Sequence, residues 1–360
     1  GHQLGNRLGR VLKVGYLPDS FGQGQDMPKI YNGFDITATV FWRGMPADKT
    51  ARYFYWRSDD DSTVLAANIK NGYYAGVELM DSDDFSGLFD KIGSDTHAHD
   101  LVLPVGGDQR PVDNHLKQRI QAANAAQSDY QVVESTYPAY FKALAETKDL
   151  PIYAGEFADA TASKIHRGIY SSRADLKQLY DRLERMMIDV VEPLMVVGKA
   201  HGLDPQPGLV DQIWKAIVRG QAHDSAGGCN SDETNRDIHQ RGEVAWQMAE
   251  ALKDYLLRKL STAYVGKLDL FFWNPTPRVL KRVMTTTVAT RQAAFSLSDS
   301  AGATVAFEVL DQKPIDAAIT RRDITQMVPD VYYQTTIAIP LTIQPLDWTG
   351  LTITETTTAM

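Results

Sequence analysis

The stretch 11–34, VLKVGYLPDSFGQGQDMPKIYNGF, joins a short apolar run to a carboxylate and a glycine-rich loop. Pro18 lacks the N–H that a strand ladder needs, so we predict a strand that ends at about Leu17. Asp19 would then lie just past the carboxyl end of that strand, where α/β enzymes place catalytic groups. The alternative is an Asx-turn residue that caps its own loop, and on this stretch alone it is the commoner case.

The composition is that of a folded protein with more than one domain. The chain has 360 residues, of which 43% are hydrophobic and 23% charged, enough for about two or three domains. A formal net charge of −8 argues against nucleic acid or an anionic membrane as the main partner. Cys229 is the single cysteine, so no internal disulfide can form and a reducing compartment, the cytoplasm, is favoured.

The ends of the chain do not resemble the ends of a whole protein. No apolar run reaches the length of a membrane span, and the first ten residues lack the apolar core of a signal peptide. The chain starts without an initiator Met and stops without an obvious finishing strand, so we expect a fragment of a longer polypeptide. No pattern specifies an oligomeric state, although many enzymes of this size form symmetric homo-oligomers.

Residues 11–150 alternate apolar runs with polar stretches, which is typical of α/β architecture. The predicted strands are 11–17, 36–42, 99–105, 130–136 and 150–156, and the predicted helix is 115–127. We therefore expect a mostly parallel sheet or barrel.

From about residue 173 the apolar spacing changes to three and four, which predicts a long amphipathic helix to Leu194. A second helix follows Pro207, and a third runs over 233–259 with Ser231 at its N-terminal cap. After 265 the sequence is β-branched and aromatic, as in an antiparallel β domain. The predicted domains are a partial α/β catalytic domain (1–160), a three-helix bundle (161–262) and a partial antiparallel β domain (263–360).

A second carboxylate follows an apolar run in LVLPVGGDQRP. We predict a strand ending at Val105, a turn at two glycines, and then Asp108 with Arg110 two residues on. Two carboxylates on neighbouring strand ends suit glycoside hydrolysis, one as nucleophile or base and the other as proton donor. The alternative is a loop ion pair between Asp108 and Arg110, which would contribute little to the stability of the fold.

The segment GQAHDSAGGCNSD places His223 and Asp224 at the end of the second predicted helix. His223 can cap the last carbonyls of that helix, or it can bind a metal with Asp224 beside it. Cys229 is expected to be a loop residue rather than a ligand. The glycine pair lacks the Lys-Ser/Thr of a phosphate-binding loop, which excludes that motif here.

Four aromatic residues in loops after predicted strands could stack on a sugar ring or belong to the core: Phe21, Trp42, Tyr73 and Tyr74. Phe21 is the best candidate for a sugar contact because it lies two residues from Asp19.

Taken together, four segments resemble glycoside hydrolase family 38, the zinc-dependent retaining α-mannosidases, in order and spacing. They are GYLPDSFGQGQDMPKIYNGF…VFWRG, LVLPVGGDQRP, GEFADATASKIHRGIYSSRADLK and QAHDSAGGCNSDETN, and the likeness is greatest to the bacterial branch that includes mannosylglycerate hydrolases. The resemblance implies a (β/α) barrel-like catalytic domain, a three-helix bundle and β-sandwich domains, of which this chain would hold a part of the first, the bundle and the start of a β-sandwich.

The resemblance also implies roles for single residues. Asp19 matches the catalytic nucleophile, which also binds Zn²⁺, and Asp108 matches the general acid/base. His223 matches a zinc ligand. The matched substrate-binding residues are Phe21, Arg110 and Asp224. The implied reaction is exo-acting hydrolysis of an α-mannoside with retention, assisted by zinc.

One part of the family pattern is missing. The other two zinc ligands of the family come from a His-x-Asp motif on its first strand, which this sequence lacks at the matching place. The sequence therefore leaves three alternatives open: a mannosidase whose remaining ligands lie elsewhere, a non-catalytic sugar-binding remnant, or a metal hydrolase acting on an acetyl or phosphoryl group.

Overall fold

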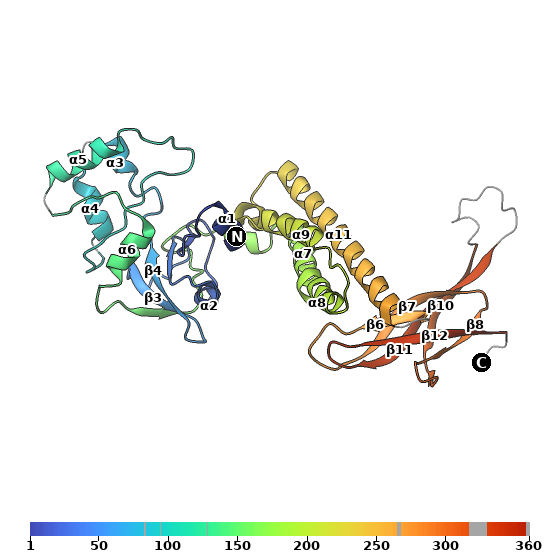
Figure 1. The fold of residues 1–360 in the computed structure, drawn as a ribbon. Coiled ribbons are helices and arrows are strands. Elements are labelled where there is room, and N and C mark those ends of the chain that lie inside the picture. The colour runs from blue at the N-terminus through green and yellow to red at the C-terminus, as the bar shows by residue number, and fades with distance from the viewer. Residues whose placement is uncertain (83, 94, 128, 265–267, 317–329, 358–360) are drawn as a thin grey trace. The chain divides into compact units, whose positions relative to one another are not determined.

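The structure is a computed structural model that describes all residues except 83, 94, 128, 265–267, 317–329 and 358–360. The chain divides into two compact units, Gly1–Ser172 and Arg173–Met360, and each is described by itself (Figure 1). The predicted fold class is confirmed, because the described chain holds a mainly parallel sheet, a set of packed helices and antiparallel sheets.

The first unit is built on a five-stranded sheet with the order β1-β2-β4-β3-β5. The strands are β1 (Gly15–Leu17), β2 (Ala38–Phe41), β3 (Tyr53–Arg57), β4 (Thr63–Asn68) and β5 (Ile152–Ala154). Of its described pairings, β3 with β4 is antiparallel and the others are parallel. The central strands β2 and β4 are almost fully buried, as is usual for parallel strands covered on both faces. As predicted, β1 ends directly before Pro18.

Alternate residues of these strands face two different cores. On one face the rings of Phe41, Trp56 and Phe157 pack together fully buried, with the Trp56 and Phe157 centroids 4.7 Å apart. On the other face Val40 and Tyr53 pack against α6. The helices of this unit are α1 (His2–Leu8), α2 (Met27–Asn32), α3 (Val77–Asp81), α4 (Ser86–Gly93), α5 (Leu116–Ala126), α6 (Tyr137–Leu144) and the 3₁₀ turn η1 (Arg167–Tyr170).

Two predicted strands are wrong. Residues 99–105 and 130–136 are irregular, although their apolar side chains contribute to the cores. The backbone of Val132 bonds the side-chain amide of Asn124 through both its N–H and its carbonyl, at 2.8 and 2.9 Å, in place of a strand partner. An apolar run therefore marked burial here and not strand pairing.

The hairpin of β3 and β4 was not predicted. The helix expected over 115–127 is confirmed as α5.

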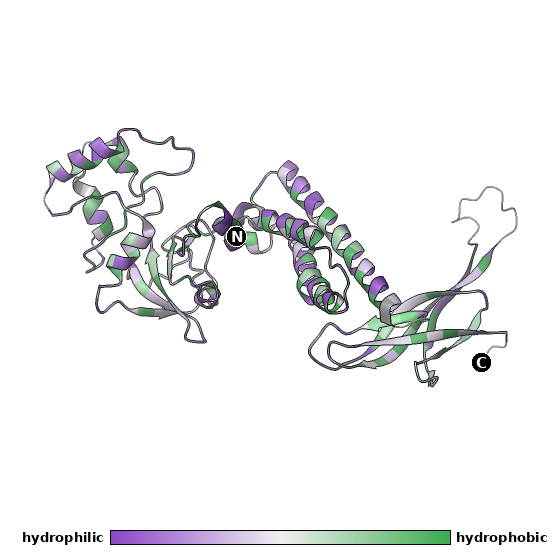
Figure 2. Ribbon diagram, in the orientation of Figure 1, coloured by the Kyte–Doolittle hydropathy of each residue, from purple (hydrophilic) through white to green (hydrophobic). Residues whose placement is uncertain are grey.

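The long helices of the second unit pack around two apolar clusters, and the Trp246 ring contacts both. The helices of this unit are α7 (Ala174–Arg185), the π-helical turn η2 (Met186–Val191), α8 (Glu192–Ala200), α9 (Pro207–Gly220), the short α10 (His223–Gly227) and α11 (Asp232–Tyr264). Figure 2 shows hydrophobic and hydrophilic residues alternating along α7, α9 and α11, which is the pattern of amphipathic helices. Leu183, Ile213 and Leu256 are fully buried where these helices meet. The Ser231 hydroxyl accepts the N–H of Thr234, which confirms the predicted N-terminal cap of α11.

The strands that follow form two antiparallel sheets, as expected for the last part of the chain. One has the order β10-β11-β7 and the other β6-β12-β8-β9. Their bounds are β6 (Leu270–Trp273), β7 (Leu280–Thr290), β8 (Ala294–Ser298), β9 (Thr304–Val305), β10 (Glu308–Asp316), β11 (Val331–Ile343) and β12 (Trp348–Thr356). Leu297, Ile337 and Ile339 are fully buried in the core that the two sheets share.

Candidate active site

Asp19 lies two residues beyond β1 and is bonded to side chains that follow two other strands. Its Oδ1 accepts from Arg43 Nη2 at 3.0 Å, and its Oδ2 accepts from the Tyr73 hydroxyl at 3.0 Å. The Asp19 side chain is only 22% exposed and that of Arg43 only 13%, so this ion pair is poorly screened by water. Asp19 is thus held as a paired carboxylate by side chains distant in the sequence, and these contacts are not those of an Asx turn.

The Tyr73 hydroxyl connects the two predicted catalytic carboxyl groups. Its oxygen lies 3.0 Å from Asp19 Oδ2 and 2.9 Å from Asp108 Oδ2. The two carboxyl oxygens are therefore no more than about 6 Å apart, close to the separation of roughly 5–5.5 Å found in retaining glycosidases. Removal from solvent, and then the hydrogen bonds with Asp108, Tyr74 and Asp19, raise the pKa of Tyr73, so its hydroxyl keeps its proton.

The loop that carries Asp108 does not follow a strand, which corrects the prediction for residues 99–105. Instead, the Gly76 N–H bonds the carbonyl of Pro104 at 2.8 Å, and the chain then turns at two glycines with positive φ. At Gly107, φ is +155° and a Cβ would lie 2.1 Å from the Tyr74 ring. The Tyr74 hydroxyl accepts the Asp108 N–H at 3.2 Å. Close approach of backbone to Tyr74, which only glycine allows, thus places Asp108 beside Tyr73.

Arg43 and Phe21 form the wall beside Asp19. The Arg43 guanidinium lies 4.1 Å from the centre of the Trp42 ring and 5.5 Å from that of Phe21, and its Nη1 donates to the Lys164 carbonyl at 2.8 Å. Phe21 meets His166 edge to face at 5.0 Å. These contacts leave the guanidinium little freedom, so Arg43 can hold the Asp19 carboxylate in one orientation.

Sequence reasoning missed Arg43, and it considered Tyr73 only as a ring that could stack on sugar. Both follow the carboxyl ends of strands parallel to β1: Arg43 comes two residues after β2, and Tyr73 comes five residues after β4. The carboxyl ends of parallel strands meet at one edge of a sheet. Inspection of every polar residue just past a predicted strand would have found Arg43. It would not have found Tyr73, because the strand before it, β4, was not predicted.

Arg110 does not pair with Asp108, so the loop ion pair considered from the sequence is wrong. Its guanidinium instead makes two bonds to the carboxylate of Asp81, of 3.1 and 2.7 Å. No cation pairs with Asp108 among the residues that the structure describes. The role of Arg110 as a substrate-binding residue stays a prediction.

His223 and Asp224 belong to the second unit. α9 ends at Gly220, and His223 is the first residue of α10 rather than the end of the preceding helix. His223 Nε2 lies 3.5 Å from Asp224 Oδ1, which also accepts from Cys229 Sγ at 3.2 Å. Burial, followed by the contact with Asp224, raises the pKa of the Cys229 thiol, which therefore stays protonated and is a poor metal ligand.

The described residues do not form a complete zinc site. In the part of the chain that the structure describes, no three His, Cys, Asp or Glu residues are grouped so that they could hold a metal ion. Protein zinc sites have at least three such ligands. Asp19 and His223 lie in different units, and each remains a single candidate ligand.

Comparison with known proteins identifies the chain's family. The model of the N-terminal domain of glycosyl hydrolases family 38 matches residues 1–156. The model of the alpha mannosidase middle domain matches residues 164–260. The chain belongs to glycosyl hydrolase family 38. This confirms the resemblance read from the four sequence segments.

Solved structures of the family share the fold. An alpha-mannosidase from Enterococcus faecalis V583 superimposes with a TM-score of 0.83 at 20% identity, covering 99% of this chain and 45% of that one. Another family 38 protein from Enterococcus faecalis gives a TM-score of 0.74 at 18% identity, covering 100% of this chain and 43% of that one.

Among curated proteins, a relative from Halalkalibacterium halodurans, provisionally named a mannosylglycerate hydrolase, is 26% identical over 257 residues. That match covers 64% of this family 38 chain but only 28% of the relative. This chain therefore spans less than half the length of the relatives it matches. None of its described helices is long and apolar enough to cross a membrane.

Proposed function

We propose that this family 38 chain hydrolyses α-mannosides from their non-reducing end, with retention of configuration, by double displacement. The observation that carries the proposal is the Tyr73 hydroxyl, which lies within hydrogen-bonding distance of both Asp19 and Asp108. At no more than about 6 Å, the two carboxyl groups leave too little room for the water that an inverting enzyme places between its sugar and its base.

The surroundings of the two carboxyl groups support different roles. Arg43 pairs with Asp19 at 3.0 Å and holds its side chain in one place, which suits a nucleophile that attacks the anomeric carbon. Asp108 has no paired cation in the described chain, which suits a group that gives a proton to the leaving oxygen and then takes one from water. In this proposal Phe21, Arg110 and Asp224 bind the substrate.

Zinc is a further part of the proposal and rests on the family. Asp19 and His223 would contribute to its site, where a zinc ion would polarise the hydroxyl groups of the sugar. Because no group of three ligands exists among the described residues, we derive no step through the metal.

We expect zinc to bind this chain weakly and hydrolysis to require it in the buffer. Dialysis should remove most of the metal, because two candidate ligands hold zinc less tightly than three or four. The measurement is elemental analysis combined with release of mannose from methyl α-mannoside, before and after a chelator and after zinc is restored. Hydrolysis that a chelator leaves unchanged would show that zinc does not assist the reaction.

A second candidate function is favoured by the same absence of a three-ligand group in the described residues: a sugar-binding remnant without catalysis. Mannose binding measured by calorimetry, with no zinc bound and no hydrolysis at any zinc concentration, would select this candidate and contradict the first. Release of acetate or phosphate from suitable esters would contradict both.

Replacement of Tyr73 by Phe is expected to lower kcat for mannoside hydrolysis by about 10- to 100-fold, because the lost hydroxyl bonds two charged or proton-carrying groups. KM should change little, and the pH profile of kcat should shift because both carboxyl groups lose a shared partner. Tyr55→Phe in β3 is the control, since the Tyr55 hydroxyl makes no hydrogen bond to another described residue. A Tyr73→Phe enzyme with the wild-type kcat and pH profile would contradict the bridging role.

A further inference from the structure

A largely buried polar network lies at the edge of the sheet that carries the candidate active site. Arg52, the residue before β3, is only 4% exposed, and its Nε donates to Asp95 Oδ1 at 3.0 Å. Its Nη2 donates to the Asn71 side-chain oxygen at 3.1 Å and to the Lys91 carbonyl at 3.2 Å. The ammonium group of Lys70 also donates to Asp95. We call Arg52, Lys70, Asn71 and Asp95 the Arg52 network, and two of its members, Lys70 and Asn71, lie in the turn that follows β4.

The direction of β3 brings Arg52 to this edge. Because β3 is antiparallel to β4, the start of β3 lies beside the carboxyl end of β4. There the Asn68 N–H donates to the Arg52 carbonyl at 2.8 Å. The carboxyl ends of β1, β2 and β4 are followed by Asp19, Arg43 and Tyr73. The Arg52 network therefore lies at the same edge as these three residues of the candidate active site.

The turn after β4 places Tyr73 close to the Arg52 network. Asn71 precedes Gly72, whose φ is +75° and where a Cβ would lie 2.8 Å from the Trp42 ring. The Tyr73 ring then meets the Trp42 ring edge to face, with the centroids 5.5 Å apart. Tyr73 thus extends from a tight turn that the Asn71 side chain connects to Arg52.

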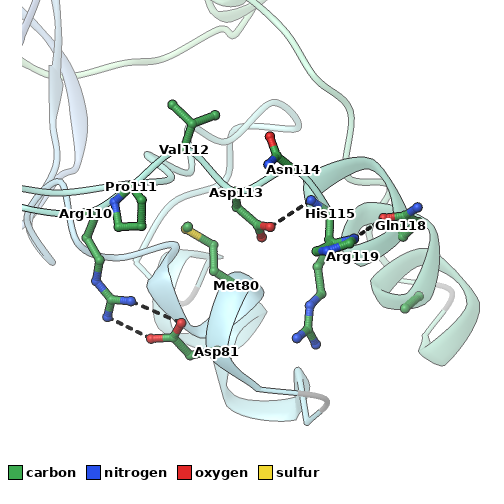
Figure 3. A pocket seen from close by; sticks show the side chains of 11 residues that line it. Met80, Asp81, Arg110, Pro111, Val112, Asp113, Asn114, His115, Gln118 and Arg119 are labelled. Carbon is green, nitrogen blue, oxygen red and sulfur yellow. Dashed lines mark hydrogen bonds and ion pairs between the residues drawn. The ribbon is translucent and has the colours of Figure 1, made fainter.

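On the other side of Tyr73, the chain is bonded to the loop that carries Asp108. α3 begins four residues after Tyr73, and at its end Asp81 accepts two bonds from Arg110, of 3.1 and 2.7 Å, beside an open pocket (Figure 3). This pair fixes α3 against the loop of Asp108. The Arg52 network fixes the turn before Tyr73 against the sheet, and the strand β1 of that sheet leads to Asp19.

The charges of the network hold the Arg52 guanidinium in one orientation. Burial alone would raise the pKa of the Asp95 carboxyl, but hydrogen bonds with Lys70 and Arg52 outweigh it and keep that pKa below its usual range. Asp95 is therefore an anion that two cations bond, and bonds of this kind are short and directional. Buried ion pairs are often no more stabilising than apolar side chains of the same volume, whereas they do fix orientation. Arg52 accordingly presents its Nη2 to Asn71 in a fixed position.

We propose that Asn71, held by Arg52, is a positioning residue for the reaction and keeps the Tyr73 hydroxyl within bonding distance of both Asp19 and Asp108. The inference rests on the proposed function, in which that hydroxyl bonds the nucleophile and the general acid. A displacement of about 1 Å in an active site can lower the rate about 100-fold, and the hydroxyl lies only 3.0 and 2.9 Å from its two partners. Asn71 touches no reacting atom and acts through the backbone of the turn.

Loss of the acceptor at position 71 should lower kcat for methyl α-mannoside about tenfold in the zinc-supplied chain, with KM within about twofold of the wild-type value. Asn71→Ala removes the acceptor, while Arg52 keeps its bonds to Asp95 and to the Lys91 carbonyl, so the fold should survive. Asn71→Asp keeps an oxygen for the guanidinium and should have the wild-type kcat.

A double-mutant cycle separates positioning from general destabilisation. If Asn71 acts through the Tyr73 hydroxyl, Asn71→Ala should lower kcat no further in a chain that already carries Tyr73→Phe. The matched control is Ser58→Ala, just past the opposite end of β3, where a buried hydroxyl donates to the Gln25 carbonyl at 2.9 Å. Ser58→Ala should lower Tm without changing kcat. A wild-type kcat in Asn71→Ala, or a further tenfold loss in the double variant, would overturn the proposal.

A measurement without turnover separates failure of this proposal from failure of the reaction. Fluorine NMR of the full chain, with meta-fluorotyrosine in place of Tyr73, reports on the surroundings of that phenol. Asn71→Ala should shift the resonance, whereas Asn71→Asp and Ser58→Ala should leave it unchanged. A resonance that depends on Asn71, in a chain that hydrolyses no mannoside, would support the positioning role and contradict the proposed function. Mannoside hydrolysis with an unchanged resonance and kcat in Asn71→Ala would do the opposite.

Discussion

Alanine at position 19 is expected to abolish mannoside hydrolysis, with a loss of at least about 10⁴-fold in kcat, comparable to removal of other nucleophiles. In the proposed mechanism Asp19 forms the bond to the anomeric carbon, and no other carboxylate among the described residues is bonded to both Arg43 and Tyr73. The measurement is mannose release by the zinc-supplied chain, with added azide as a test. Azide should restore turnover in Asp19→Ala and yield the β-mannosyl azide, because the small anion attacks from the vacated face.

The control is Asp35→Ala, which removes an aspartate whose side chain is 93% exposed beside Lys13. Thermal unfolding of Asp19→Ala should remain cooperative, so that lost activity reflects lost chemistry. An Asp19→Ala chain with wild-type activity would show that the nucleophile is another residue. No turnover by the wild type at any zinc concentration would instead contradict the proposed function as a whole.

Alanine at position 108 is expected to slow hydrolysis of methyl α-mannoside by about 10²–10⁴-fold, the usual contribution of a general acid. The effect should depend on the leaving group. An acidic phenol can leave without receiving a proton, so for a mannoside with such an aglycone the rate of the first step should fall far less. A burst of phenol should then precede slow hydrolysis of the mannosyl-enzyme.

The control is Asp100→Ala, which changes an exposed aspartate in the irregular segment that leads to Asp108. This variant should behave as the wild type. A uniform loss for both leaving groups in Asp108→Ala would contradict the acid/base role and indicate that Asp108 only positions Tyr73 or the loop.

Much of the fold could be predicted because local patterns and packing agree. The helices α7, α9 and α11 have apolar residues at spacings of three and four, and the tertiary structure buries those residues in two apolar clusters between the helices. Pro18 ends β1 by removing a donor, which needs no knowledge of the rest of the chain. The failures at 99–105 and 130–136 have one cause: apolar residues can be buried in a loop when polar side chains such as Asn124 satisfy its backbone.

The candidate site was only partly predictable. Asp19 and Asp108 could be named from the sequence because each follows an apolar run and belongs to a family motif. Arg43 could be noticed as a polar residue after a predicted strand, but its role could not be assigned, because an arginine after a strand is as often a surface residue. Its role depends on Asp19, 24 residues away in the sequence, and on the Phe21 and Trp42 rings around its guanidinium.

By itself, then, the sequence determined the order of an α/β region, a helical region and a β region, the family, and the two carboxylates, since all of these rest on periodicity or on short motifs. Only the tertiary structure decided which side chains those carboxylates contact. It places the Tyr73 hydroxyl within hydrogen-bonding distance of both Asp19 and Asp108. It also pairs Arg43 with Asp19, and it pairs Arg110 with Asp81 instead of Asp108. These are contacts between residues far apart in the chain. Their partners are chosen by the packing of a sheet edge and by glycine turns, and no local pattern encodes that choice.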